Sequence, residues 1–86
     1  MADTFSQTLE NIRFRDLRVG DRARVLRYAT TGGAYRNRLM SLGLTPGAEF
    51  TVCQVAPLGD PMEIRLRGFQ LSLRRQEAGD MEVERL

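Results

Sequence analysis

Histidine, lysine and tryptophan are absent from this 86-residue sequence, and cysteine occurs once. Without histidine the chain lacks the side chain best suited to proton transfer near neutral pH, which is also the commonest metal ligand. A single Cys53 cannot form an intrachain disulfide or a Cys-x-x-Cys metal site, and it fits a reducing compartment. We therefore expect no catalytic residue, no bound metal and no cofactor.

Long apolar runs are also lacking. No stretch approaches the roughly 18 apolar residues that span a bilayer, and the polar residues 1–11 do not resemble a signal peptide. We expect a cytoplasmic protein with a flexible N-terminal arm, residues 1–11, and one domain, residues 12–86. A chain of this length buries only about 60 to 65% of its surface on folding, which favours a binding module over an enzyme.

Alternating apolar residues predict short strands. Met62, Ile64 and Leu66 alternate with charged residues, a pattern typical of a half-buried strand. Strands are expected at residues 22–28, 49–56, 62–67, 69–74 and 80–84. The strand at residues 22–28 has an imperfect period, which is compatible with either a bulge or an exposed edge. Phe14 and Leu17 predict a short apolar turn before it, and residues 75–79 are long enough for one helical turn.

One helix is expected at residues 34–42, after a break at residues 30–33 that is rich in threonine and glycine. Gly43 ends the predicted helix, and Pro46-Gly47 predicts a type II turn. Three apolar residues fall on one helical face and are expected to fill the mouth of the fold: Tyr35, Leu39 and Leu42.

This order of elements predicts a mainly β protein, a small five-stranded SH3-like barrel with a short helix inserted after the first strand. Closure of a barrel removes the exposed edges that an open sheet would carry. A flat four-stranded sheet capped by the helix is the alternative, but Pro57 and Pro61 favour a sharp corner. Unpaired edges at the seam leave self-association open.

All 13 positive charges are arginine, and 11 carboxylates leave a formal net charge of +2. Residues 13–38 hold eight arginines against Asp16 and Asp21, a local charge of +6. This segment keeps a nucleic-acid-binding small barrel as an alternative. Four carboxylates in residues 76–84 and the lack of an aromatic-basic strand pattern disfavour nucleic acid.

Several short blocks occur in an order that identifies a family. They are Leu17 and Gly20, Arg38-Leu39, Leu42-Gly43-Leu44, Pro46-Gly47, Pro57-Leu58-Gly59-Asp60-Pro61, Leu73-Arg74, Ala78, Met81 and Val83. With them the chain resembles the FeoA family of small ferrous iron transport proteins over residues 14–83. The resemblance implies an SH3-like barrel that acts beside FeoB, a membrane ferrous iron transporter with a cytosolic GTPase domain.

That resemblance implies an accessory protein at the inner face of the membrane, attached through its partner. Similar barrels form the C-terminal domain of metal-dependent transcriptional repressors, so a stand-alone domain related to those repressors is a further alternative. The sequence shows no DNA-binding helix pair, which disfavours a complete repressor.

Six residues are the candidates for partner contact. Arg36 and Arg38 on the helix offer planar donors for carboxylate or phosphate, although a solvated helix face is the favoured interpretation of the pair. An arginine finger that enters the GTPase site is a more specific hypothesis for the same pair. The remaining four are Leu58 and Asp60 in the corner, and Arg65 and Arg67 on the third strand.

Other polar residues receive structural interpretations. Asp80, Glu82 and Glu84 could chelate a metal weakly, but alternate residues on a strand share a face and here simply make it soluble. Cys53 lies in a predicted strand and is expected to be a small buried hydrophobe.

Overall fold

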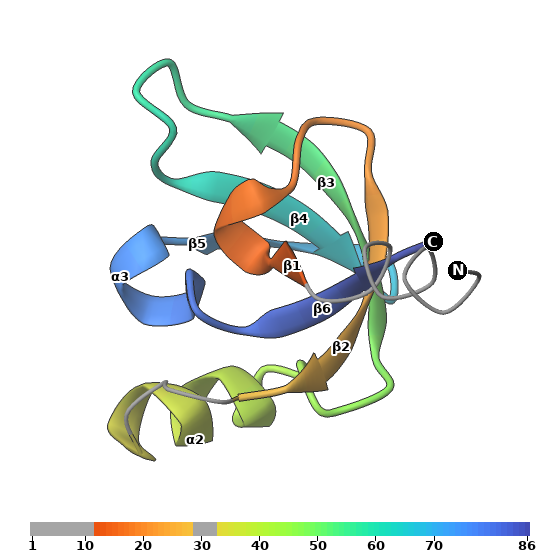
Figure 1. The fold of residues 1–86 in the computed structure, drawn as a ribbon, viewed down its shortest axis with the longest axis vertical. Helices are drawn as coiled ribbons and strands as arrows, with labels where there is room; N and C mark the ends of the chain where they lie inside the picture. Colours follow the sequence, from red (N-terminus) through yellow and green to blue (C-terminus); the bar gives the residue numbers. More distant parts are fainter. Residues whose placement is uncertain (1–11, 29–32) are drawn as a thin grey trace, which may run out of the picture.

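The computed structural model describes residues 12–28 and 33–86, so the predicted N-terminal arm and most of the break at residues 30–33 lie outside the described residues. Within these ranges the chain forms a coiled sheet with two helices and a 3-10 turn (Figure 1). The elements are β1 (Ile12–Arg13), η1 (Phe14–Asp16), β2 (Arg22–Arg27), α2 (Gly33–Ser41), β3 (Glu49–Val55), β4 (Met62–Leu66), β5 (Phe69–Leu73), α3 (Arg75–Ala78) and β6 (Glu82–Arg85).

All strand pairs are antiparallel, in the order β1-β6-β2-β3-β4-β5. The predicted mainly β, SH3-like barrel is confirmed, with the helix after its first long strand. The prediction missed β1, because two residues are too few to show a period. The last strand begins at Glu82 and not at Asp80, since the Met81 amide closes a turn onto the Ala78 carbonyl at 3.0 Å.

Apolar side chains from the strands, both helices and the 3-10 turn pack in one core. Phe14 of η1 is fully buried, and its ring centroid lies 5.9 Å from that of Phe50 on β3, so the predicted apolar turn before β2 is confirmed. The imperfect period of this strand, which left a bulge or an exposed edge open, corresponds to a register shift of β2 against β6 between Val25 and Arg27. No helix among the described residues has the length and apolar character that a bilayer crossing requires.

Helix α2 touches this core at its C-terminal end. Gly43 follows it with φ of 110°, and a Cβ there would lie 3.1 Å from Leu66 Cδ2, so the predicted helix stop is confirmed. The prediction that three apolar residues of the helix fill the barrel mouth is wrong in part. Leu39 is buried and Leu42 half-buried, but Tyr35 is 37% exposed, because it lies in the first turn, away from the contact with β4.

Two tight turns fix the ends of neighbouring strands. The Ala48 amide donates to the Thr45 carbonyl at 2.9 Å with Gly47 at φ 93°, the geometry of the predicted type II turn. Between β4 and β5, Arg67 and Gly68 both have positive φ, 52° and 89°. Two such residues form a type I′ hairpin turn, which suits the twist of antiparallel strands.

Candidate functional site

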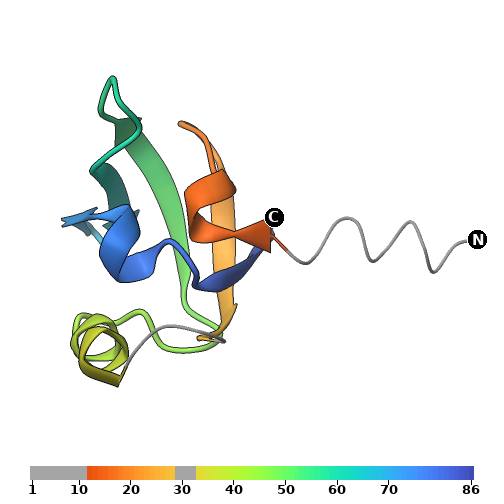
Figure 2. The same cartoon turned by 60° about the vertical axis from the view of Figure 1, so that its left-hand side comes forward.

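Helix α3 connects two segments that are distant in sequence. The Arg75 amide donates to Asp60 Oδ1 at 2.8 Å, which joins the start of α3 to the loop between β3 and β4. On the other side, Arg38 of α2 pairs with Glu77. Figure 2 shows α2 and α3 on the same side of the sheet. The exposed side chains on α3 and on the segments that contact it, here called the α3 surface, are Tyr35, Leu58, Arg75 and Gln76. Arg36 is exposed on α2, next to Tyr35 in the sequence.

Leu58 is the most exposed apolar residue of the α3 surface, at 93%. The loop that carries it is closed by the Gly59 amide, which donates to the Ala56 carbonyl at 2.7 Å, with Gly59 at φ 88°. The turn therefore holds Leu58 out into solvent. The Arg75 guanidinium covers Gly59 from the other side, because a Cβ at Gly59 would lie 3.0 Å from its nitrogen.

The four predicted contact residues on α2 and on the loop between β3 and β4 differ in what they offer a partner. Asp60 and Arg38 are already engaged inside the molecule, with the Arg75 amide and with Glu77. Arg36 is exposed and has no carboxylate partner within the described part of the chain. Among the residues that the structure describes, no ion pair engages Arg36 and no packing covers Leu58, so these two members of the set are the better candidates for binding another molecule.

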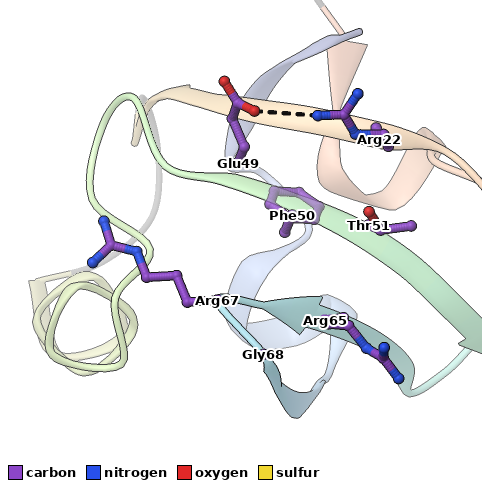
Figure 3. A pocket seen from close by; sticks show the side chains of 7 residues that line it. All are labelled: Arg22, Glu49, Phe50, Thr51, Arg65, Arg67 and Gly68. Atoms are coloured by element: carbon purple, nitrogen blue, oxygen red, sulfur yellow. Dashed lines mark hydrogen bonds and ion pairs between the residues drawn. The ribbon is translucent and has the colours of Figure 1, made fainter.

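Arg65 and Arg67 lie elsewhere, at the far end of β4. They border a hollow of about 290 Å³ together with Arg22, Glu49, Phe50, Thr51 and Gly68 (Figure 3). Arg65 pairs in register with Thr51, which pairs with Arg22, so a row of polar side chains crosses three strands. The side chains of Arg65 and Arg67 point apart in Figure 3. The hollow therefore does not converge on one small anion.

The structure thus divides the six candidates into two groups, and it adds residues that the sequence did not indicate. Arg75 and Gln76 join the first group through contacts with Gly59 and with Tyr35, whose hydroxyl lies 3.4 Å from Gln76 Nε2. No local sequence signal marks these contacts, because the partners are 16 and 41 residues apart.

The basic segment of the sequence is largely neutralised by ion pairs with residues that are distant in sequence. The pairs join Arg13 and Arg15 to Asp80, Arg22 and Arg24 to Glu49, Arg24 to Glu84, Arg27 to Glu82, and Arg85 to Asp21. The hydrogen bond that Arg24 donates to the Glu49 carboxylate raises the pKa of Arg24 above its ordinary value. The carboxylates near the C-terminus, interpreted from sequence as a merely soluble face, are in fact the partners of these arginines.

Cys53 is half-buried, so the prediction of a buried cysteine is wrong. Phe50 and Val52 of β3 face the core, which directs Thr51 and Cys53 to the outer face, and a register shift against β4 follows Val52. The Cys53 Sγ lies 3.7 Å from the Thr51 carbonyl oxygen. In residues 12–28 and 33–86, no three side chains of histidine, cysteine, aspartate or glutamate gather into a metal site.

Comparison with known proteins gives related sequences and folds. Residues 12–85 match the family model of the FeoA domain. A fusion of Fe(2+) transport protein A with the Fe(2+) transporter FeoB from Porphyromonas gingivalis is 38% identical over 73 residues. That match covers 85% of this chain, but the chain spans only 8% of the length of this curated relative.

Solved structures show the same fold. The FeoA protein of Chlorobium tepidum superposes with a TM-score of 0.76 at 43% identity, over 87% of this chain and 70% of the other. The IdeR protein of T. acidophilum has a TM-score of 0.78 at 20% identity, over 88% of this chain and 34% of the other. The second likeness concerns the fold alone.

Proposed function

This chain belongs to the FeoA family, and from that premise we propose that it is a cytoplasmic, non-enzymatic accessory of ferrous iron uptake that docks on the cytosolic part of a FeoB-type transporter and modulates its activity. The observation that carries the proposal is the relative in which FeoA and FeoB form one polypeptide. Fusion gives two domains a high effective concentration for each other. When the two proteins are separate chains, a docking surface is needed to keep them together.

The α3 surface supplies the side chains that such docking requires. An exposed leucine held out by a rigid turn can enter an apolar pocket, and arginine is enriched among the residues that dominate protein interfaces. Leu58 and Arg75 provide this combination, and Arg36 is a further exposed arginine on α2. Iron is the cargo of the partner in this proposal, so the accessory chain needs no ligand set of its own.

Leu58→Asp tests the docking role directly. Because Leu58 is 93% exposed, the variant should keep the melting temperature of the wild type while its affinity for a purified FeoB-type transporter falls roughly tenfold or more. Val19→Asp is the matched control, since Val19 is 60% exposed and lies outside the α3 surface. Equal affinities for the wild type and both variants would contradict docking through this surface.

Modulation is measured in the same mixture through GTP hydrolysis by the transporter. An arginine finger stabilises developing charge on the transferred phosphoryl group, so its removal slows turnover without weakening docking. Arg36→Ala and Arg38→Ala should separate the two possibilities. If the two variants support the wild-type rate at saturating concentration, the arginines act only in docking or in the fold.

A further inference from the structure

Strand β5 is an edge strand of the sheet and pairs only with β4 among the described strands. At alternate residues its main-chain N–H and C=O groups therefore point away from β4. The type I′ turn makes Leu66 and Phe69 a hydrogen-bonded pair, so Leu71 and Leu73 also bond to β4. The intervening residues Gln70 and Ser72 must then direct their N–H and C=O groups away from β4. Within the described ranges, no hydrogen bond reaches these four main-chain groups.

This edge lacks the features that usually block pairing with another chain. Natural edge strands carry proline or charged residues, contain bulges or are covered by another element. Phe69–Leu73 contains neither proline nor a charged residue, and its register with β4 is regular. The edge therefore remains competent to form a ladder with an added strand.

The two sides of β5 differ in polarity. Phe69 and Leu71 face the same side as the buried Leu66 and Ile64, yet Phe69 is 47% exposed and Leu71 is half-buried. Gln70 and Ser72 are exposed on the opposite side. An added strand would extend the apolar inner face only if its own alternate residues were apolar.

Arginines stand at both ends of the edge. Arg67 lies in the turn before β5, and Arg74 and Arg75 follow its last residue. None of the three has a carboxylate partner for its guanidinium within residues 12–28 and 33–86. The edge also joins the two groups of candidate contact residues, because it runs from Arg67 to α3 (Figure 1).

We propose that the edge of β5 is a site of β-strand addition, at which an extended acidic segment of the partner protein pairs with Gln70 and Ser72. Main-chain hydrogen bonds supply affinity in this mode, and alternate side chains supply specificity. Apolar residues of the segment lie beside Phe69 and Leu71, and carboxylates at its ends meet Arg67 and Arg74. This inference rests on the proposed function, since the segment belongs to the FeoB-type transporter.

A second copy of this chain is a poorer occupant. The antiparallel register that uses all outward groups pairs Gln70 of each copy with Ser72 of the other. Continuing that register brings Arg67 of each copy beside Arg74 and Arg75 of the other. Like charges at cross-strand positions are destabilising. Charge complementarity therefore selects an acidic segment over self-pairing.

Hydrogen–deuterium exchange on the wild-type chain, with and without the purified full-length transporter, is the direct test. Binding should slow exchange of the Gln70 and Ser72 amides, which have no hydrogen-bond acceptor within the described part of the free chain. Ser72→Pro removes the outward N–H while leaving the ladder to β4 intact, so affinity should fall about fivefold to tenfold. Ser72→Thr retains the N–H and should bind like the wild type.

Arg74→Gln adds a test of charge, with Arg18→Gln as a control from an exposed arginine between η1 and β2. Only the Arg74 variant should weaken binding, and the loss should shrink at high salt. Bound complex without slower exchange at Gln70 and Ser72 overturns strand addition and leaves docking intact, whether or not Ser72→Pro folds. Failure of the wild type to bind the transporter overturns both proposals. If the same amides are protected in a dimer of the free chain, a second copy pairs with β5, and the proposal that an acidic segment does so is overturned.

Discussion

At the scale of single residues, Tyr28 connects the ends of two elements. It follows β2, and its hydroxyl donates a hydrogen bond to the carbonyl of Leu44, which follows α2. Burial raises the pKa of Tyr28 from its ordinary value of 10.0 to about 12. Ionisation would remove the donor and place a charge beside a carbonyl oxygen, so the folded state favours the neutral phenol.

This shift predicts how stability depends on alkaline pH. A folded-state pKa above the unfolded value means that the unfolded chain releases its proton first as pH rises. The contribution of Tyr28 to the free energy of unfolding is therefore complete below pH 10.0 and is lost as pH rises to about 12. Urea titrations at a series of pH values measure it.

Two variants isolate this effect. Tyr28→Phe should lower the stability at neutral pH by about 1 kcal/mol through loss of the hydrogen bond, and it should flatten the alkaline decline. Tyr35→Phe should retain the decline, because it leaves the Tyr28 phenol and its hydrogen bond to the Leu44 carbonyl in place. Identical alkaline profiles for the wild type and Tyr28→Phe would show that another group controls the transition.

At the scale of elements, the start of α3 is held by the loop between β3 and β4, which precedes it in the sequence by the strands β4 and β5. A helix start leaves main-chain N–H groups unsatisfied, and side-chain oxygens usually accept from them. Here Asp60 accepts from the Arg75 amide, although it lies 15 residues earlier. The contact fixes the loop that carries Leu58 relative to α3.

Asp60→Ala should therefore destabilise the protein by about 1 kcal/mol, the usual cost of losing a helix cap. Leu58→Ala is the matched control from the same loop and should leave the melting temperature unchanged, because Leu58 is exposed. Thermal unfolding of both variants measures the difference. An unchanged melting temperature for Asp60→Ala combined with weaker transporter binding would make Asp60 a direct contact residue.

The elements also show which parts of the fold and of the candidate site could be predicted from the sequence. Alternation revealed β4 and β5, and glycine and proline revealed the turns, because these signals depend on neighbouring residues. Tyr35 has the spacing of a core residue, but packing at the other end of α2 decides its exposure. Six contact candidates followed from residue type and from the predicted helix, corner and strand that carry them. Their separation into two groups depends on strand order, which no local pattern encodes.

At the scale of the whole molecule, charge is arranged across strands and not along the chain. The sum over residues 13–38 suggests a basic patch, yet β3 and β6 bring carboxylates beside β2. Arg24 lies between Glu49 and Glu84, and Arg27 pairs with Glu82. Because every pair has at least one side chain that water reaches, its stabilisation is small, roughly 0 to 1 kcal/mol. Its larger consequence is to cancel the field that would attract a polyanion.

This arrangement predicts weak affinity for nucleic acid. It also predicts that removal of a paired carboxylate increases that affinity. Mixed-sequence duplex DNA should show no salt-dependent binding to the wild type near physiological ionic strength. Glu49→Gln should create such binding, because it releases Arg22 and loosens Arg24 beside the hollow that Arg65 and Arg67 border. Fluorescence anisotropy at a series of salt concentrations measures both.

The charge-matched control for that experiment is Glu63→Gln. Glu63 lies on the same face of β4 as Arg65, but it forms no ion pair with a described residue, so its neutralisation changes the net charge without releasing an arginine. If net charge governs binding, the two variants gain equal affinity. If local pairing governs it, Glu49→Gln gains alone, with a steeper fall in affinity as salt rises, because more arginines then reach the phosphates. Tight, salt-sensitive binding by the wild type would contradict the pairing argument altogether.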